Sequence, residues 1–242
     1  SGGITMNTVL RRAFALTTYG GIGLFTLSGT VAAQSTTRDL IMGLNRNLLI
    51  LAVPIGIFMT GLLLYAILKF RDREEPKPTG ESKALEISWT VATAAILLFV
   101  GLSAYGVMAE PAVTAPKTVE EVEGDPVEVD ITGQQFDWIF QYPEHDVTSP
   151  REMVLPVNET IFMRVHSRDM IHAVHVPELA LKSDAIPGQV NTLQTTITEE
   201  GNYTLYCAEY CGRGHSKMYA DVRVVNQTEY EDWLAEEQME DE

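Results

Sequence analysis

The chain has 242 residues, enough for one or two domains, and carries 17 Lys/Arg against 33 Asp/Glu, a formal net charge of −16 at pH 7. A chain this acidic is not expected to bind nucleic acid, because binding phosphates requires clustered cations. Hydrophobic residues nevertheless make up 45% of the sequence, so the apolar and the acidic residues must be segregated along the chain.

The first 33 residues have the features of a secretory signal. A basic pair, Arg11 and Arg12, precedes the charge-free run 13–33, which ends in the small residues of "TVAA". This pattern favours a cleaved signal peptide over an uncleaved first membrane span. The initial "SGGIT" is interpreted as an extraneous remnant ahead of a natural start at Met6.

Two longer apolar runs follow the signal. Residues 48–68 and 87–109 contain no charged residue over 21 and 23 positions. At 1.5 Å per residue, each run reaches the ~30 Å of a hydrocarbon core. We therefore predict a transmembrane helical hairpin with its linker over residues 34–116, with spans at about 48–70 and 87–109. Two buried helices of a soluble protein are the alternative, and they seldom stay apolar on every face over such a length.

The charges flanking the spans predict the orientation. The loop 69–83 between the two spans carries five Lys/Arg, whereas the segment 34–47 carries two. Cytoplasmic loops carry the excess of Lys and Arg, so this loop is expected to be cytoplasmic. Everything after residue 110 then lies outside, whether or not the signal is cleaved. We predict a multi-pass protein of the cell membrane with an extracellular C-terminal domain.

Residues 117–228 are predicted to form one all-β domain. Short runs rich in Val, Ile, Thr and aromatic residues alternate here with Pro, Gly and Asn clusters, as in "VEVDITGQQFDWIFQY" and "NTLQTTITEEGNYTLYC". Several such strands in about 110 residues fit a sandwich or a Greek-key barrel. The last segment, 229–242, is rich in Asp and Glu and is predicted to be an acidic tail.

The acidity is concentrated in this outer part. Residues 117–242 carry 8 Lys/Arg and 26 Asp/Glu. Two interpretations stay open: a solvated surface suited to high salt, or a patch that steers a positively charged partner to its docking site.

The stretch "CAEYCGRGHSKM", residues 207–218, contains both cysteines of the chain together with His215 and Met218. A disulfide between the cysteines is one interpretation, since two cysteines in an exported domain usually pair. A disulfide, however, requires neither the imidazole nor the thioether. Thiolate, imidazole and thioether ligands together are what copper prefers, whereas zinc sites usually show C-x2-C pairs without methionine. We favour copper and leave a disulfide or another metal open.

A further ligand is expected from another strand, because one loop alone would hold a metal poorly. His145 lies among turn residues and His166 ends a predicted strand. His172 and His175 share "DMIHAVHVPEL" and lie on opposite faces of an extended segment, so one of the two can be a ligand.

At this point a family resemblance becomes visible. The segments "DMIHAVHVPEL", "SDAIPGQVN" and "CAEYCGRGHSKM", together with "LEISWT" and "GQQFDWIFQY", resemble subunit II of haem-copper cytochrome c oxidases over about residues 40–226. The resemblance implies a cupredoxin-like outer domain that binds a binuclear copper A centre. The implied ligands are His172, Cys207, Glu209 through its backbone carbonyl, Cys211, His215 and Met218.

The resemblance also implies the activity. Such a subunit accepts electrons from a soluble or membrane-attached carrier, a cytochrome c or a blue-copper protein. It passes them to haem in subunit I, which reduces O2 to water, coupled to proton translocation. The implied partners are subunit I, the other oxidase subunits and the membrane, and the subunit itself is expected to hold no haem. Together with the acidity, the resemblance suggests a halophilic archaeal source.

Three more roles are implied by position. The Glu209 carboxylate would bind a Mg²⁺ ion shared with subunit I, and Glu86 would stand at the cytoplasmic mouth of a proton pathway. An acid favoured by the helix dipole is the alternative for Glu86. Phe136 occupies the place of the family's first tryptophan in G-H-Q-W-x-W, where the electron enters, and Trp138 is the next candidate. Asp169 is expected to bond nearby backbone or to help seat the domain on subunit I.

Proteins of other classes share some of these features. A copper A nitric oxide reductase subunit would have the same architecture as this chain. A stand-alone copper electron carrier would need neither the two spans nor Glu86. A quinol oxidase subunit would lack the copper ligands, and a nitrous oxide reductase would need a further histidine-rich domain.

Overall fold

The computed structural model describes residues 34–72, 75, 78 and 80–240. The expected signal peptide and the remnant before it therefore lie outside the described residues.

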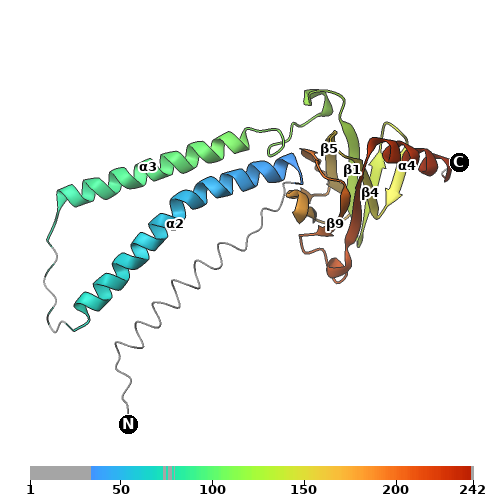
Figure 1. Ribbon diagram of the computed structural model, residues 1–242. Coiled ribbons are helices and arrows are strands. Elements are labelled where there is room, and N and C mark those ends of the chain that lie inside the picture. Colours follow the sequence, from blue (N-terminus) through green and yellow to red (C-terminus); the bar gives the residue numbers. More distant parts are fainter. Residues whose placement is uncertain (1–33, 73–74, 76–77, 79, 241–242) are drawn as a thin grey trace, which may run out of the picture. The chain divides into compact units, whose positions relative to one another are not determined.

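Two long helices come first, α2 (Thr36–Phe70) and α3 (Lys83–Met108), and both are long and apolar enough to cross a membrane (Figure 1). Each begins at a serine cap: Ser35 Oγ accepts the N–H of Arg38, and Ser82 Oγ accepts the N–H of Leu85. Helix α2 starts twelve residues before the predicted span, because its first turns extend past the apolar run toward the outer domain.

The start of α2 is hydrogen-bonded to residues of the outer part of the chain. Ser35 Oγ donates to the Leu179 carbonyl at 2.6 Å, and Thr37 Oγ1 donates to the Ala112 carbonyl at 2.9 Å. The Arg38 guanidinium donates to two carbonyls of the short 3-10 helix η2 (Pro177–Leu179). These hydrogen bonds connect the start of the helix to η2 and to the segment that follows α3.

The outer domain consists of two five-stranded sheets (Figure 1). The first has the order β3 (Val147–Pro150), β2 (Asp137–Tyr142), β1 (Val127–Gln134), β5 (Thr160–Ser167) and β8 (Asn191–Thr196). The second has the order β4 (Glu152–Pro156), β10 (Tyr219–Val225), β9 (Gly201–Cys207), β6 (His172–Val176) and β7 (Leu181–Ala185). All neighbours are antiparallel except the pairs β1–β5 and β4–β10. Two further 3-10 turns are η1 (Val119–Glu121) and η3 (His215–Lys217).

The core lies between the sheets because the strands alternate buried and exposed side chains. In β10, Ala220, Val222 and Val224 are buried while Tyr219 and Asp221 are exposed. The opposite sheet contributes large, fully buried side chains that include Ile131, Phe140 and Met163. Two apolar N-terminal helices followed by a cupredoxin-like β-sandwich confirm the predicted fold class.

The end of the chain differs from the predicted acidic tail. Residues Gln227–Glu240 form helix α4, which packs against β3 and β4 (Figure 1). Tyr230, Trp233 and Leu234 are spaced i, i+3 and i+4, lie on one face and are buried. The Trp233 ring lies 5.1 Å from that of Tyr142, centroid to centroid. Three buried apolar residues within an acidic sequence thus face the sandwich, and Gln238 and Glu229 add polar contacts to His145 and Arg223.

The strand register brings three connections to one end of the sandwich. Gly133 pairs with both Trp138 of β2 and Ser167 of β5. Val174 of β6 pairs with Cys207, the last residue of β9. The β1–β2 turn, the β5–β6 loop and the β9–β10 loop therefore lie together.

Candidate metal centre

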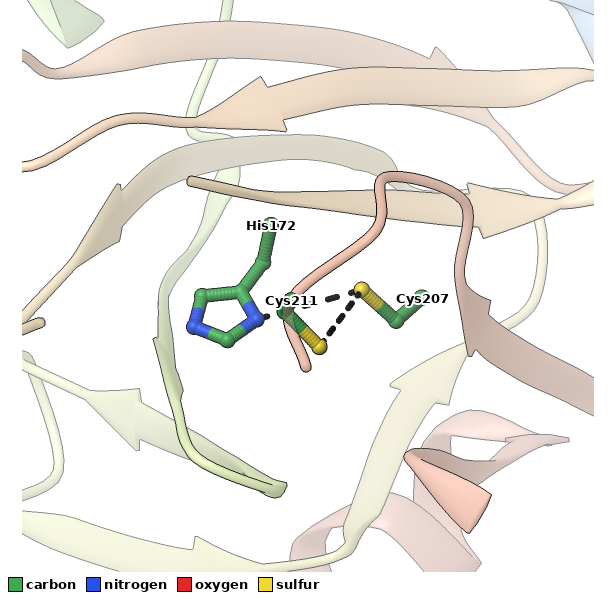
Figure 2. Close-up of side chains that lie close together, drawn as sticks. All are labelled: His172, Cys207 and Cys211. Atoms are coloured by element: carbon green, nitrogen blue, oxygen red, sulfur yellow. Dashed lines mark hydrogen bonds between the residues drawn. The ribbon is translucent and has the colours of Figure 1, made fainter. Parts of the chain in front are cut away.

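The two cysteine sulfurs form the middle of a compact group of donor atoms. Cys207 Sγ lies 3.8 Å from Cys211 Sγ and 3.8 Å from Nδ1 of His172 (Figure 2). Among the described residues, His172, Cys207 and Cys211 are the one group of three His, Cys, Asp or Glu side chains close enough together to hold a metal ion. The sulfurs are far beyond the ~2.05 Å of a disulfide, and both cysteines are free.

Three more donors surround the sulfurs. Cys211 Sγ lies 3.6 Å from Nδ1 of His215 and 3.7 Å from Sδ of Met218. Cys207 Sγ lies 3.1 Å from the Glu209 carbonyl oxygen. The structure thus brings all six residues of the expected ligand set together, with one imidazole beside each thiol.

The chain segments explain why these atoms converge. Cys207 ends β9, and Met218 stands immediately before β10, so the ten residues between them form a loop whose two ends are held by an antiparallel ladder. A backbone pair, the Cys207 N–H donating to the Met218 carbonyl at 3.0 Å, closes that loop. His172 opens β6, the neighbour of β9, and projects into the loop from the side.

Four of the six donor residues are shielded from water, whereas His215 is half-buried and the Glu209 side chain is exposed. His172 and Met218 are fully buried, and Cys207 and Cys211 are 4% and 1% exposed. Burial, together with the neighbouring Cys207 thiol, raises the pKa of Cys211 to about 11. Because only a thiolate ligates a metal, loading must release protons, and metal affinity falls as pH falls.

Asp169 orients the first imidazole. Its Oδ1 lies 2.8 Å from Nε2 of His172, and its carboxylate also accepts the N–H groups of Gln135 and Met170, both at 2.7 Å. Burial raises the pKa of this carboxyl, but the hydrogen bonds from His172 and the two N–H groups outweigh it and lower the pKa to about 2. An ionised carboxylate only accepts, so Nε2 carries the hydrogen and Nδ1 is left free to face Cys207.

This role of Asp169 was not predicted from the sequence. The sequence interpretation expected Asp169 to bond nearby backbone, as it does, but did not connect it with His172. The three-residue spacing of Asp169 and His172 was the available signal.

Phe136 lies at the surface in contact with the cysteine loop. It is 37% exposed, and its ring covers Gly212 and Gly214. A Cβ atom at Gly214 would overlap this ring, and Gly212 has φ +119°, which a residue with a side chain rarely adopts. Gln135 Nε2 donates to the Cys211 carbonyl at 2.8 Å and fixes the turn onto the loop.

Trp138 is placed differently from Phe136. It is completely buried, and its ring lies 6.0 Å from that of His172 in an edge-on arrangement. It therefore contacts the centre from the core side and offers no surface to a partner.

The remaining candidates have the following places. Glu86 is exposed in the first turn of α3, and its N–H donates to the Ser82 carbonyl. The Glu209 side chain is exposed, although its carbonyl faces Cys207. His166 bonds Thr132 and His175 packs against Tyr206, so neither belongs to the centre.

Comparison with known proteins gives the family. The model described as "Cytochrome C oxidase subunit II, transmembrane domain" matches residues 26–107, and that described as "Cytochrome C oxidase subunit II, periplasmic domain" matches residues 146–225. The chain belongs to the cytochrome c oxidase subunit II family. It is accordingly a membrane protein with an extracytoplasmic C-terminal domain.

Individual relatives and one solved structure are similar to this chain. Cytochrome c oxidase subunit 2 of Cereibacter sphaeroides is 28% identical over 255 residues, which cover 89% of this chain and 80% of that protein. The corresponding protein of Synechocystis sp. is 26% identical over 246 residues, with 84% and 74% covered. The solved periplasmic domain of subunit II from Bradyrhizobium japonicum is 29% identical, covers 49% of this chain and 98% of that one, and has a TM-score of 0.47.

Proposed function

We propose that this chain accepts electrons at a binuclear copper A centre and passes them to haem in subunit I of a membrane-bound terminal oxidase that reduces O2 to water, with proton translocation. The electron-accepting role in a haem-copper oxidase follows from the family, and the nitric oxide reductase and the stand-alone carrier are not favoured. The observation that supports copper A is the cluster of two thiols, two imidazoles, a thioether and a carbonyl around one buried point.

The donor set fits two copper ions better than one metal of another kind. Two sulfurs 3.8 Å apart can be shared by two ions, and each sulfur has its own imidazole, His172 or His215. Soft thiolates and a thioether select copper over hard cations, and weak axial ligands tune its potential. When bound, a copper A centre supplies a one-electron couple spread over both metals.

The protein residues hold this couple in a fixed, dry environment. Asp169 fixes the His172 tautomer, and the ladder between β9 and β10 fixes the two ends of the loop. A site that is held in one geometry in both redox states has little to rearrange when an electron arrives. This favours fast transfer at a small driving force.

Roles at the periphery complete the proposal. Phe136, exposed and in contact with the loop, is the point where the electron enters. The exposed Glu209 carboxylate is free to share a Mg²⁺ ion with subunit I while its carbonyl serves the centre. Glu86 begins a proton pathway at the cytoplasmic side. The donor is a cytochrome c or a blue-copper protein, and the halophilic archaeal source stays a prediction.

The test is copper stoichiometry and spectroscopy of the purified full chain. We expect two copper ions per chain and the electron paramagnetic resonance signal of a mixed-valence pair. Cys211→Ser should leave at most one copper, because the second sulfur that two metals share is lost. A variant that kept both coppers would refute the assignment.

A matched pair of histidine variants tests whether His172 is a copper ligand. His172→Asn should abolish the mixed-valence signal, whereas His175→Asn, on the same strand but against Tyr206, should preserve it. Equal effects of the two substitutions would count against His172 as a ligand.

A further inference from the structure

We propose that the surface around Phe136 docks an electron donor that presents an acidic face, an inference that rests on the proposed function. Three segments form this surface, residues 133–138, 167–172 and 207–218, and we call them the copper-side loops. They contain three Lys/Arg and three Asp/Glu, whereas the rest of residues 117–242 contains five and 23. Residues 117–242 carry a net charge of −18, from 8 Lys/Arg and 26 Asp/Glu, and this charge comes entirely from outside the copper-side loops.

The three cations of these loops are available to a partner. Arg168, Arg213 and Lys217 are exposed, and within the part of the chain that the structure describes none of them forms an ion pair. By contrast, the described ion pairs of the outer domain engage Arg151, Arg164 and Arg223. Of the five Lys/Arg of residues 117–242 that form no ion pair in the described structure, three therefore lie in the copper-side loops, and the other two are Lys117 and Lys182.

The acids of the same loops are mostly occupied. Asp137 accepts the Arg151 guanidinium at 2.8 Å. Asp169 accepts hydrogen bonds from His172, Gln135 and Met170. Glu209 has no such partner in the described structure, and Asp169 keeps its charge because the N–H groups that it accepts are neutral. Three exposed cations therefore stand against two carboxylates that have no cationic partner, so the uncompensated charge of this surface is positive by one unit.

The cations flank the exposed aromatic ring. Arg213 stands between Gly212 and Gly214, the two residues that lie under the Phe136 ring. From the other loop, Arg168 donates through its N–H to the Gly133 carbonyl and through Nη1 to the Gln134 side chain, two residues before Phe136.

The loop that carries Arg168 also exposes apolar side chains. Met170 and Ile171 are 37% and 48% exposed, and the Met170 sulfur accepts a hydrogen bond from Gln135 Nε2 at 3.1 Å. An apolar centre with a charged rim is typical of interfaces in which the centre gives contact and the rim gives orientation and selectivity. Here the rim is cationic, so the complementary partner carries carboxylates.

Salt screening of charges determines whether a docked donor responds to the cations around Phe136 or to the acidity of the whole domain. Exposed charges are screened over ~10 Å at 0.1 M salt, so acids elsewhere on the domain act weakly on a docked donor, whereas Arg168 and Arg213 would touch it. The acidity then serves solvation in high salt, the first of the two interpretations that the sequence left open. Steering of a basic donor is not required.

The proposal is tested with the copper-loaded full chain in detergent and two small oxidants of opposite charge. Hexacyanoferrate(III) and tris(phenanthroline)cobalt(III) each take one electron from the reduced centre and are themselves reduced by one. In the double variant Arg168→Glu/Arg213→Glu, the reaction with the anionic oxidant should slow roughly tenfold at low ionic strength, and that with the cationic oxidant should accelerate by a similar factor. Both effects should shrink as salt is added.

The matched control is the double variant Lys117→Glu/Lys182→Glu. Both lysines are exposed and lie outside the copper-side loops, Lys182 on β7 in register with His175, so the control makes the same total charge change away from the ring. It should change either rate by less than twofold. Rates that respond equally to both variants would mean that total charge, and not the rim, controls the approach, and would overturn the proposal.

Protein probes then identify the partner class. Plastocyanin, with an acidic contact face, should exchange electrons with the wild-type chain faster than a lysine-rich cytochrome c, and the double variant should reverse that order. A wild-type chain that prefers the basic cytochrome would overturn the proposal. The copper spectrum distinguishes failure of the proposed function from failure of the docking proposal. If the wild-type chain lacks the copper A spectrum, the proposed function is refuted. If the spectrum is intact but the double variant reacts with the probes at wild-type rates, only the acidic donor is refuted.

Discussion

Replacing Asp169 by Asn tests whether the carboxylate beside His172 matters to the metal. The substitution keeps the shape of the side chain and one oxygen, which at the Oδ1 position can still accept from Met170 and His172. It places an amide NH2 against the Gln135 N–H and removes the charge that holds the hydrogen on Nε2 of His172. Partners of this kind, which orient a metal-ligating histidine, typically change metal affinity 10–100-fold. We expect the copper dissociation constant to rise by about that factor while the stoichiometry at saturating copper stays at two.

The assay is competition with a copper chelator, followed by the mixed-valence signal. Asp137→Asn serves as the control, because Asp137 is a nearby acid that pairs with Arg151 and touches no ligand. Equal affinities of wild type and the Asp169 variant would refute the orienting role.

The pH dependence of the unfolding free energy of the metal-free protein tests the Asp169 contacts independently of copper binding. The pKa of Asp169 is lowered to about 2 in the folded chain from an ordinary value of 3.8. A depressed folded pKa stabilises the fold fully above the ordinary value, and this contribution is lost as pH falls through the folded value. Between about pH 4 and pH 2, wild type should therefore lose more stability than Asp169→Asn. Parallel acid-unfolding curves would contradict this.

Three further outcomes are expected. Trp233→Ala should lower the free energy of unfolding by about 3 kcal/mol in urea titrations without altering the copper spectrum, because Trp233 is 6% exposed; Met239→Ala, at 70% exposed, should change it little. Gly214→Ala should displace the Phe136 ring and slow reduction of the centre by a donor while both coppers stay bound. Glu86→Gln should slow O2 reduction by the assembled oxidase in turnover assays but leave reduction of the copper centre unchanged. Normal turnover would favour the alternative that Glu86 is only an acid stabilised by the helix dipole.

The sequence predicts the architecture well where composition alone carries the information. The two uncharged runs and the alternating strands led to the helical hairpin and the sandwich, and the structure confirms both. The C-terminal segment shows the limit, because its acidic composition concealed the stripe formed by Tyr230, Trp233 and Leu234. Whether such a stripe finds a partner depends on Tyr142, more than 80 residues away in the sequence, which no local pattern reveals.

The candidate centre was likewise predictable from the sequence only where its residues are close together in the chain. The cysteine loop was recognisable because its donors are close in sequence, and the choice of His172 over His175 came from the resemblance. The Asp169 contact and the cover of Phe136 over Gly212 and Gly214 depend on how the β1–β2 turn meets two other loops. Such contacts are set by tertiary register and not by spacing within one segment.

The fold separates the part of the centre that must stay fixed from the part that must meet a partner. His172, Met218 and the two cysteines are buried and are held by neighbouring strands, so they cannot respond to what docks outside. Phe136 lies on a turn of the other sheet and reaches the loop only through ring contacts and the hydrogen bond from Gln135 to the Cys211 carbonyl. Among the proposed ligands only the half-buried His215 and the exposed Glu209 reach the surface, so charges such as Arg168 and Arg213 can change with the donor without altering the buried part of the redox centre. Donor selectivity and copper chemistry are therefore expected to respond to different substitutions, which is why variants at the rim and at Asp169 should have separable effects.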